Sequence, residues 1–282
     1  MPKLIDTGPS EWGWHRLDDA RCLHFYAARH VYDLPQSQIP SKHLVFGSMI
    51  HLVLGHHYKR MQLELKGSDP DVYYTPDQAL EAWSDRLTGA DLRTFDEKFT
   101  DTMQMYELYK QRFGKDSRWE VLQVEKELRL KVKDPKTGKV YTYTQGEDLR
   151  IRDRVTGKVH TVDHKSTYAL HPRVTKRLQT DGQFIGYWVF GRMRYGEDFG
   201  GPIINFLKKP QGKTPWEFRR DLVPYAPGLT GNLKQLILHR RRLIDQHEGL
   251  GLDRWPREFS QHTCWSAYGE CAMARACQGR MF

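Results

Sequence analysis

The segment from Val121 to Lys165 constrains the fold most, because its residues alternate with a period of two and turn sequences interrupt it twice. Apolar side chains recur at alternate positions, as in a strand with one face against a core. The sequences DPKTGK at 134–139 and DRVTGK at 153–158 have the composition of turns. We therefore predict a meander of three strands, over residues 121–132, 140–152 and 159–165.

Helical patterns flank this meander on both sides in the chain. Apolar residues recur at three to four positions in several segments, which is the periodicity of helices. We expect helices over residues 17–32, 42–65, 76–87, 91–113, 172–195 and 229–247, and two further strands over 202–208 and 216–223. This order of elements is typical of an α/β fold with a central sheet.

Three charged residues of the predicted meander can meet at one place. Asp163 and Lys165 are two residues apart, so they share one face of a strand. Asp148 lies on the preceding strand, across the turn, and a hairpin can bring it beside them. Two carboxylates can hold a divalent cation such as Mg²⁺, and a lysine can orient water or neutralise charge on a phosphate. The alternative is an ordinary surface ion pair.

The four cysteines have the number and spacing of a thiolate site. Cys22 lies near the start of the chain, whereas Cys264, Cys271 and Cys277 follow one another as C-x6-C-x5-C. Four thiolates can bind Zn²⁺ or an iron–sulfur cluster, and the alternative is a set of thiols without a ligand. A centre bound by all four would join the ends of the chain, which favours a structural role.

One histidine stands out on the predicted helix 42–65. Gly47, His51 and Gly55 are spaced by four and share one helix face. The two glycines leave room for a neighbouring element beside His51. We therefore treat His51 as a candidate functional residue, with a packed core histidine as the alternative.

In chain order, these features resemble the RecB-like branch of the PD-(D/E)XK nuclease superfamily, which includes recombination nucleases, CRISPR-adaptation nucleases and phage exonucleases. The resemblance covers nearly the whole chain. It rests on an ordered set of residues: Cys22, Gly47 with His51, Asp148, Asp163 with Lys165, Gln183 with Tyr187, and Cys264, Cys271 and Cys277.

The resemblance implies a restriction-endonuclease-like core, with a central mixed β-sheet flanked by helices. It implies a single nuclease domain over 1–282, with a mainly helical part (1–115), a catalytic sheet core (116–228) and a C-terminal helix with a cysteine clip (229–282). Asp148, Asp163, His51 and the His164 carbonyl would bind Mg²⁺ or Mn²⁺. Lys165 would position water, Gln183 would hold the lysine or the phosphate, and Tyr187 would line the site. The four cysteines would hold a [4Fe–4S] cluster, with Zn²⁺ as the less favoured alternative.

The sequence departs from the family pattern at one point. Gly146 stands two residues before Asp148, where the family usually has a spacing of three. Glu147 and Asp153 are therefore alternative metal ligands. Glu125, on the preceding predicted strand, is a candidate extra acid.

The chain carries a formal net charge of +9, from 44 Lys and Arg against 35 Asp and Glu, which favours a polyanionic partner such as DNA. Basic residues that follow the predicted strands are candidate DNA contacts: Arg173, Lys176, Arg177, Lys208 and Lys209. We expect an exonuclease for DNA ends or single strands in recombination, repair or replication. It can act alone or with a helicase or recombination protein as a partner, and both alternatives stay open.

Three other functions stay open: an inactive end-binding subunit with the same fold, a Zn²⁺-stabilised basic adaptor, and an RNA substrate. No apolar stretch is long enough for a membrane helix, and the N-terminus lacks the pattern of a signal peptide. We therefore expect a cytoplasmic protein without a membrane partner.

Overall fold

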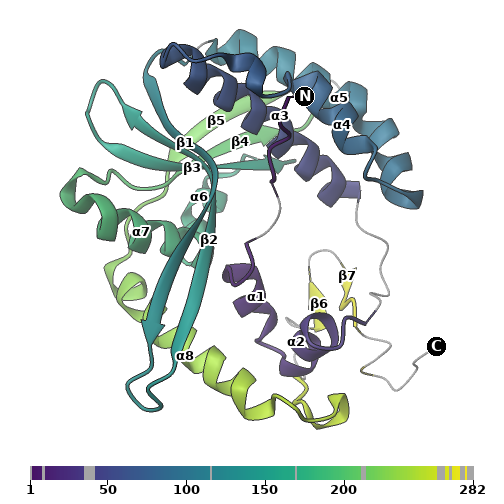
Figure 1. Ribbon diagram of the computed structural model, residues 1–282, viewed down its shortest axis with the longest axis vertical. Helices are drawn as coiled ribbons and strands as arrows, with labels where there is room; N and C mark the ends of the chain where they lie inside the picture. Colours follow the sequence, from purple (N-terminus) through teal and green to yellow (C-terminus); the bar gives the residue numbers. More distant parts are fainter. Residues whose placement is uncertain are drawn as a thin grey trace. The chain divides into compact units, whose positions relative to one another are not determined.

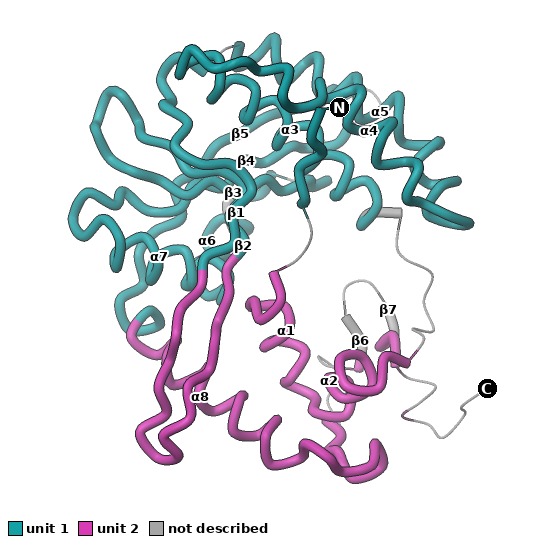
Figure 2. Tube along the Cα trace, in the orientation of Figure 1, with its two compact units in different colours: residues 1–9, 40–128, 146–230 teal, residues 10–39, 129–145, 231–282 magenta. Residues whose placement is uncertain are grey.

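The computed structural model describes residues 2–7, 10–34, 42–114, 116–168, 170–210, 214–258, 264–266, 269–273 and 277. The chain divides into two compact units (Figure 2). Unit 1 comprises Met1–Pro9, Pro40–Leu128 and Gly146–Thr230, and unit 2 comprises Ser10–Ile39, Arg129–Gln145 and Gly231–Phe282. The single nuclease domain over 1–282 stays a prediction.

A mixed sheet of five strands, in the order β1-β2-β3-β4-β5, forms the centre of the fold (Figure 1). The strands are β1 (Trp119–Lys133), β2 (Val140–Asp153), β3 (Val159–Thr167), β4 (Ile203–Lys208) and β5 (Glu217–Leu222). β3 pairs antiparallel with β2 and parallel with β4, and β5 pairs antiparallel with β4. The predicted meander and the two later strands are therefore confirmed, as is the α/β class with a mixed sheet.

Helices of unit 1 cover both faces of the sheet. They are α3 (Lys42–Leu65), α4 (Pro76–Ser84), α5 (Gly89–Phe113), α6 (Pro172–Leu178) and α7 (Gly182–Tyr195), with short 3-10 turns at Pro70–Val72 and Gly196–Asp198. Leu207 of β4 packs in one core cluster with residues of α3 and α5, whereas Phe206 packs in another with residues of α7. Neighbouring residues of a strand point to opposite faces, so α3 and α5 lie on one face and α7 on the other.

Unit 2 has a smaller core of its own. It includes α1 (Trp14–Asp19), α2 (Leu23–His30), most of α8 (Pro227–His247), the 3-10 turn Leu252–Arg254, and the two-residue strands β6 (Trp265–Ser266) and β7 (Gly269–Glu270). Tyr26, Ile244 and Trp255 are buried together in this core. Among the residues described, no helix is long and apolar enough to cross a membrane.

Two of the predicted helices are each broken by a residue that caps a new helix. In place of the predicted helix 17–32, the structure has α1, which ends at Asp19, and α2, which begins after Cys22. Cys22 caps α2, because its Sγ accepts a hydrogen bond from the Phe25 amide. The predicted helix 172–195 breaks before Asp181, whose carboxylate accepts from the Gln183 amide at 2.8 Å. Side chains that bond backbone amides favour a helix start over continuation.

Candidate active site

Strands β2 and β3 bring Asp148 close to the Asp163-x-Lys165 segment. Leu149 pairs with Val162 in the antiparallel register, which places Asp148 beside the start of that segment. The His164 amide donates to Asp148 Oδ2 at 2.7 Å. His51 of α3 contacts the same carboxylate, with 3.3 Å between its Nδ1 and Asp148 Oδ2. The fold therefore joins residues from a helix and two strands around Asp148.

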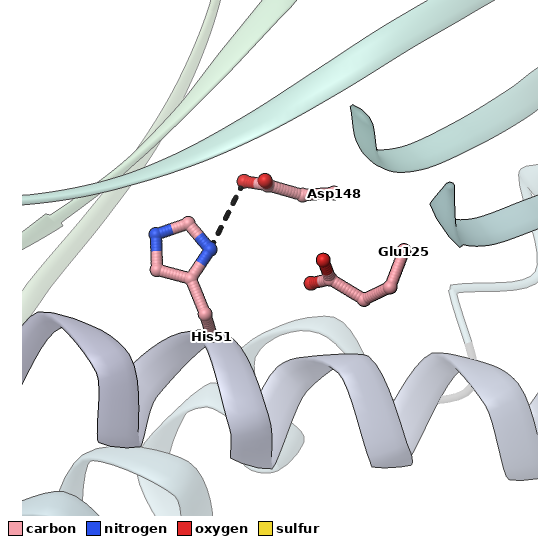
Figure 3. Close-up of side chains that lie close together, drawn as sticks. All are labelled: His51, Glu125 and Asp148. Carbon is pink, nitrogen blue, oxygen red and sulfur yellow. Dashed lines mark ion pairs between the residues drawn. The ribbon is translucent and has the colours of Figure 1, made fainter. Parts of the chain in front are cut away.

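Glu125 of β1 completes a group of three ligand-type side chains with His51 and Asp148 (Figure 3). Their nearest ligand atoms all lie within 4.8 Å of one another, and no other such group of three occurs among the residues described. Glu125 has a backbone φ of 42°, in the left-handed region, which is uncommon for a residue with a side chain. Strain of this kind concentrates at functional sites.

Gly55 makes room for Glu125, whereas Gly47 leaves open space. A Cβ atom at Gly55 would lie 3.3 Å from Glu125 Cγ, which is a tight contact. A Cβ atom at Gly47 would meet nothing within 4 Å. Of the two glycines beside His51, Gly55 is therefore the one that admits a neighbouring side chain.

A second set of polar side chains surrounds Asp163, which is fully buried. Its Oδ1 accepts from Gln183 Nε2 at 2.8 Å and from Tyr187 Oη at 2.9 Å, and its Oδ2 lies 3.0 Å from Lys165 Nζ. Gln183 Oε1 also accepts from Lys165 at 3.4 Å, and the Tyr187 Oη lies 3.0 Å from the Gly146 carbonyl oxygen. Helix α7 therefore holds the Asp–Lys pair through one glutamine and one tyrosine.

The protonation of these groups follows from burial and from their neighbours. Burial lowers the pKa of His51, but the Asp148 carboxylate raises it more, so the net shift is upward. Burial opposes the ionisation of Asp148, but His51 outweighs it and holds the Asp148 pKa below its usual range. Burial, and then the carboxylates of Asp148 and Asp163, raise the pKa of Glu125 well above normal.

The site has the features that a divalent cation requires. Glu125 Oε1 is a buried oxygen with no hydrogen-bond partner in the part of the chain described, and the buried Asp163 Oδ2 has only its ion pair with Lys165 at 3.0 Å. Buried acceptors without a donor are costly, and a cation beside them removes that cost. Carboxylate oxygens and an imidazole fit Mg²⁺ or Mn²⁺. Asp163 lies outside the group of three, so Glu125, His51 and Asp148 form the closest set.

His164 and the two alternative acids have other surroundings. The His164 imidazole is buried, with Nδ1 2.8 Å from Asn205 Nδ2, and it is the backbone amide of His164 that bonds Asp148. Glu147 is buried in an ion pair with Arg150 and accepts from Thr161 at 2.8 Å. Asp153 binds Arg118 at 2.6 Å and accepts from amides of the next turn. Both alternative acids therefore lie outside the group around Asp148.

The four cysteines are free thiols, and they do not form a group within 4.8 Å. Some of them are linked through shared neighbours. Cys22 Sγ accepts from the Glu258 amide at 3.5 Å, and Cys264 Sγ donates to the Glu258 carbonyl at 3.3 Å. The Cys271 amide donates to the Cys264 carbonyl at 2.8 Å.

The candidate DNA contacts fall into two sets. Arg173, Lys176 and Arg177 are exposed on α6, which follows β3, and none of the ion pairs among the residues described includes them. Lys208 pairs with Glu217 at 3.0 Å. Lys209 is buried, with its Nζ 4.3 Å from the Phe46 ring centre and 4.9 Å from that of Tyr168. Burial lowers the pKa of Lys209 to about 8.

The sheet with helices on both faces, and an Asp-x-Lys segment on a central strand beside a second acid, define a class of metal-dependent nucleases. Comparison with protein families agrees: a family described as the PD-(D/E)XK nuclease superfamily matches residues 20–278. The chain belongs to this superfamily. The family acts on nucleic acid as a phosphodiesterase, so the chain is a metal-dependent nuclease by family.

The other comparisons add little. No curated protein matches the chain. Sixteen chains of solved structures match. One of them, SSO0001, is 13% identical with a TM-score of 0.33, and the match covers 64% of this chain and 68% of that one.

Proposed function

We propose that the protein is a DNA exonuclease of the RecB-like, iron–sulfur branch of its superfamily, acting on ends or single strands. One observation carries the proposal: the Glu125–His51–Asp148 group lies beside the Asp163–Lys165 pair, which α7 holds through Gln183 and Tyr187. An inactive protein has no need to keep a lysine paired with a fully buried carboxylate that also accepts from two further donors. Recombination, repair or replication is the proposed setting, with a helicase or recombination protein as a partner.

Asp148, Glu125 and His51 would hold the divalent cation, with Asp163 and the His164 carbonyl as further ligands. A bound Mg²⁺ or Mn²⁺ would polarise the phosphoryl oxygen and lower the pKa of water. The His164 amide orients Asp148 through its bond to Oδ2. Gln183 and Tyr187 occupy Asp163 Oδ1, which leaves Oδ2 toward Lys165.

Lys165 is suited to orient the attacking water rather than to deprotonate it. Burial lowers the pKa of Lys165, but the carboxylates of Asp163 and Asp148 raise it more. The ammonium group therefore stays protonated at neutral pH. Its side chain is 40% exposed, so it can donate to water or to a phosphate oxygen while Asp163 holds it. A fixed positive charge at this position stabilises the negative charge that develops during hydrolysis.

Helix α6 is the favoured contact for the DNA backbone. It directly follows the strand with the Asp-x-Lys segment, and its three basic side chains are exposed and form no ion pair with any residue that the structure describes. Lys208 and Lys209 are weaker candidates, because one is paired with Glu217 and the other is buried between two aromatic rings. Side chains that contact phosphates position DNA without reading its sequence.

The four cysteines are the proposed ligands of a [4Fe–4S] cluster in unit 2. Burial raises the pKa of the Cys271 thiol, and the nearby thiols of Cys277, Cys22 and Cys264 raise it further. These thiols come from both ends of the chain and affect one another's ionisation, although they do not form a group within 4.8 Å. A cluster or a Zn²⁺ ion would need all four as thiolates.

The test is digestion of end-labelled single- and double-stranded DNA with Mg²⁺ or Mn²⁺. We expect mononucleotide or short products from wild type, and a rate about 10²–10³-fold lower for Lys165→Met. Lys158→Met is the control, because Lys158 is an exposed lysine just before β3 that bonds the Glu197 carbonyl. DNA binding without any cleavage by wild type would contradict the proposal and support an end-binding subunit instead.

A further inference from the structure

A connected set of buried polar side chains in unit 1 ends at His164, the residue whose amide holds Asp148. Its members come from five different segments of the chain. They are Tyr58 of α3, Tyr109 of α5, Asp116 between α5 and β1, Asn205 of β4 and Arg220 of β5. None of them belongs to a sequence motif of the site, and each lies in or against the hydrophobic core.

The Asp116–Arg220 ion pair anchors this set. Arg220 donates to both oxygens of Asp116, at 2.7 and 2.8 Å. Its guanidinium lies between the rings of Phe113 and Trp119, at 3.5 and 3.7 Å from their centres. Asp116 has a φ of 44°, in the left-handed region. A largely enclosed, bidentate and stacked arginine is a rigid anchor, and the strained aspartate persists because its surroundings hold it.

The donors of these hydrogen bonds can be assigned from Asp116 back to Asn205, which donates toward both Tyr109 and His164. Tyr58 donates its only proton to Asp116 at 2.7 Å, so its oxygen accepts from Tyr109, also at 2.7 Å. Tyr109 has then used its proton, and its oxygen accepts from Asn205 Nδ2 at 2.9 Å. The second Nδ2 proton of Asn205 is directed at His164 Nδ1, at 2.8 Å. His164 is therefore neutral with its proton on Nε2, an assignment that the network determines.

One further contact holds the His164 ring. It stacks on Tyr58 with 5.9 Å between ring centres and 7° between planes. The ring and the amide of His164 belong to one residue, and the amide bonds Asp148 Oδ2 at 2.7 Å. Holding the ring therefore limits how far the peptide, and with it the Asp148 carboxylate, can move.

We propose that Asn205 and Tyr109 are positioning residues that, through His164, hold Asp148 in the orientation that binds the divalent cation. This inference rests on the proposed metal-dependent function. Groups one step removed from a metal ligand typically change metal affinity or activity by about 10–100-fold when they are lost. A network that served folding alone would leave metal affinity unchanged when a single hydroxyl is deleted.

The experiment measures Mn²⁺ binding to the full-length protein by titration calorimetry, together with cleavage as a function of Mn²⁺ concentration. Asn205→Leu removes both donors at similar size, and Tyr109→Phe removes one hydroxyl. Tyr106→Phe is the matched control, because Tyr106 is a buried tyrosine on the same helix whose hydroxyl lies 3.2 Å from His57 Nδ1. Thermal unfolding identifies any variant that fails to fold.

We expect Asn205→Leu to weaken Mn²⁺ binding by about 10-fold or more, with a smaller loss for Tyr109→Phe and less than about 2-fold for Tyr106→Phe. At saturating Mn²⁺, cleavage by the variants should recover toward the wild-type rate. If folded Asn205→Leu binds Mn²⁺ with wild-type affinity, this inference is overturned and the proposed function is not. If Asn205→Leu does not fold, wild-type Mn²⁺ affinity in Tyr109→Phe has the same consequence. A wild-type protein that neither binds Mn²⁺ nor cleaves DNA would overturn the proposed function as well.

Discussion

Glu125→Gln should make the protein more stable than wild type when no metal is bound. It should also reduce the stabilisation that a bound metal provides. The Glu125, Asp148 and His51 ligand atoms lie within 4.8 Å of one another, so Glu125 faces the Asp148 carboxylate at close range. Two unit charges at that distance repel by about 0.9 kcal/mol at a dielectric of 80 and about 3.5 kcal/mol at 20. The raised pKa of Glu125 shows the same strain, because burial and the neighbouring acids oppose its ionisation.

Without metal, the glutamine removes this repulsion and keeps the shape of the side chain. We expect a gain of about 1 kcal/mol, which is a rise in Tm of about 2–4 °C for a chain of this size. With metal, the variant lacks one ligand, and a tenfold weaker affinity removes about 1.4 kcal/mol of the stabilisation by saturating Mn²⁺. The wild-type protein should therefore gain more from Mn²⁺ than the variant.

The assay is thermal unfolding in EDTA and in Mn²⁺, with Glu127→Gln, two residues further along β1, as the control for loss of one carboxylate. Glu127→Gln should show the wild-type response to Mn²⁺. A lower Tm for Glu125→Gln than for wild type in EDTA would refute the repulsion argument. An unchanged Mn²⁺ response would remove Glu125 from the set of ligands.

Three further predictions test other parts of the molecule. Burial lowers the pKa of folded His57 from 6.5 to about 4, so as the pH falls the unfolded chain takes up the proton first. The free energy of unfolding should therefore decrease by about 3 kcal/mol between pH 6.5 and pH 4. Urea unfolding that depends on pH in the same way in His57→Gln as in wild type would contradict this. Anaerobically purified protein should be brown and Cys264→Ser colourless and less stable, whereas active, colourless, zinc-containing wild type would exclude the cluster. Replacing both Lys176 and Arg177 by Gln should weaken binding of all DNA sequences alike and reduce the salt slope by roughly 0.7–0.9 per lost phosphate contact, and an unchanged slope would exclude α6 from the interface.

The pattern of the chain predicted the secondary structure well wherever the signal is local. The helix over 42–65 has the predicted bounds, and the strands begin and end within a few residues of their predicted positions. Periodicity predicts these elements because the backbone geometry of a helix or strand sets which neighbours share a face. It failed at Cys22 and Asp181, where one side chain bonds a nearby amide and starts a new helix inside an otherwise continuous pattern.

The order of the chain was enough to predict that Asp148 lies close to Asp163 and Lys165, because neighbouring strands joined by short turns tend to pair. Only the tertiary structure decided which other groups join them. Glu125 reaches the site because β1 carries a left-handed residue there and Gly55 of α3 leaves space for it. Asn205, a polar residue within the apolar run of β4, gained a role only when α5 and β3 brought Tyr109 and His164 to it. Such convergence depends on packing between elements far apart in the chain, which no local periodicity encodes.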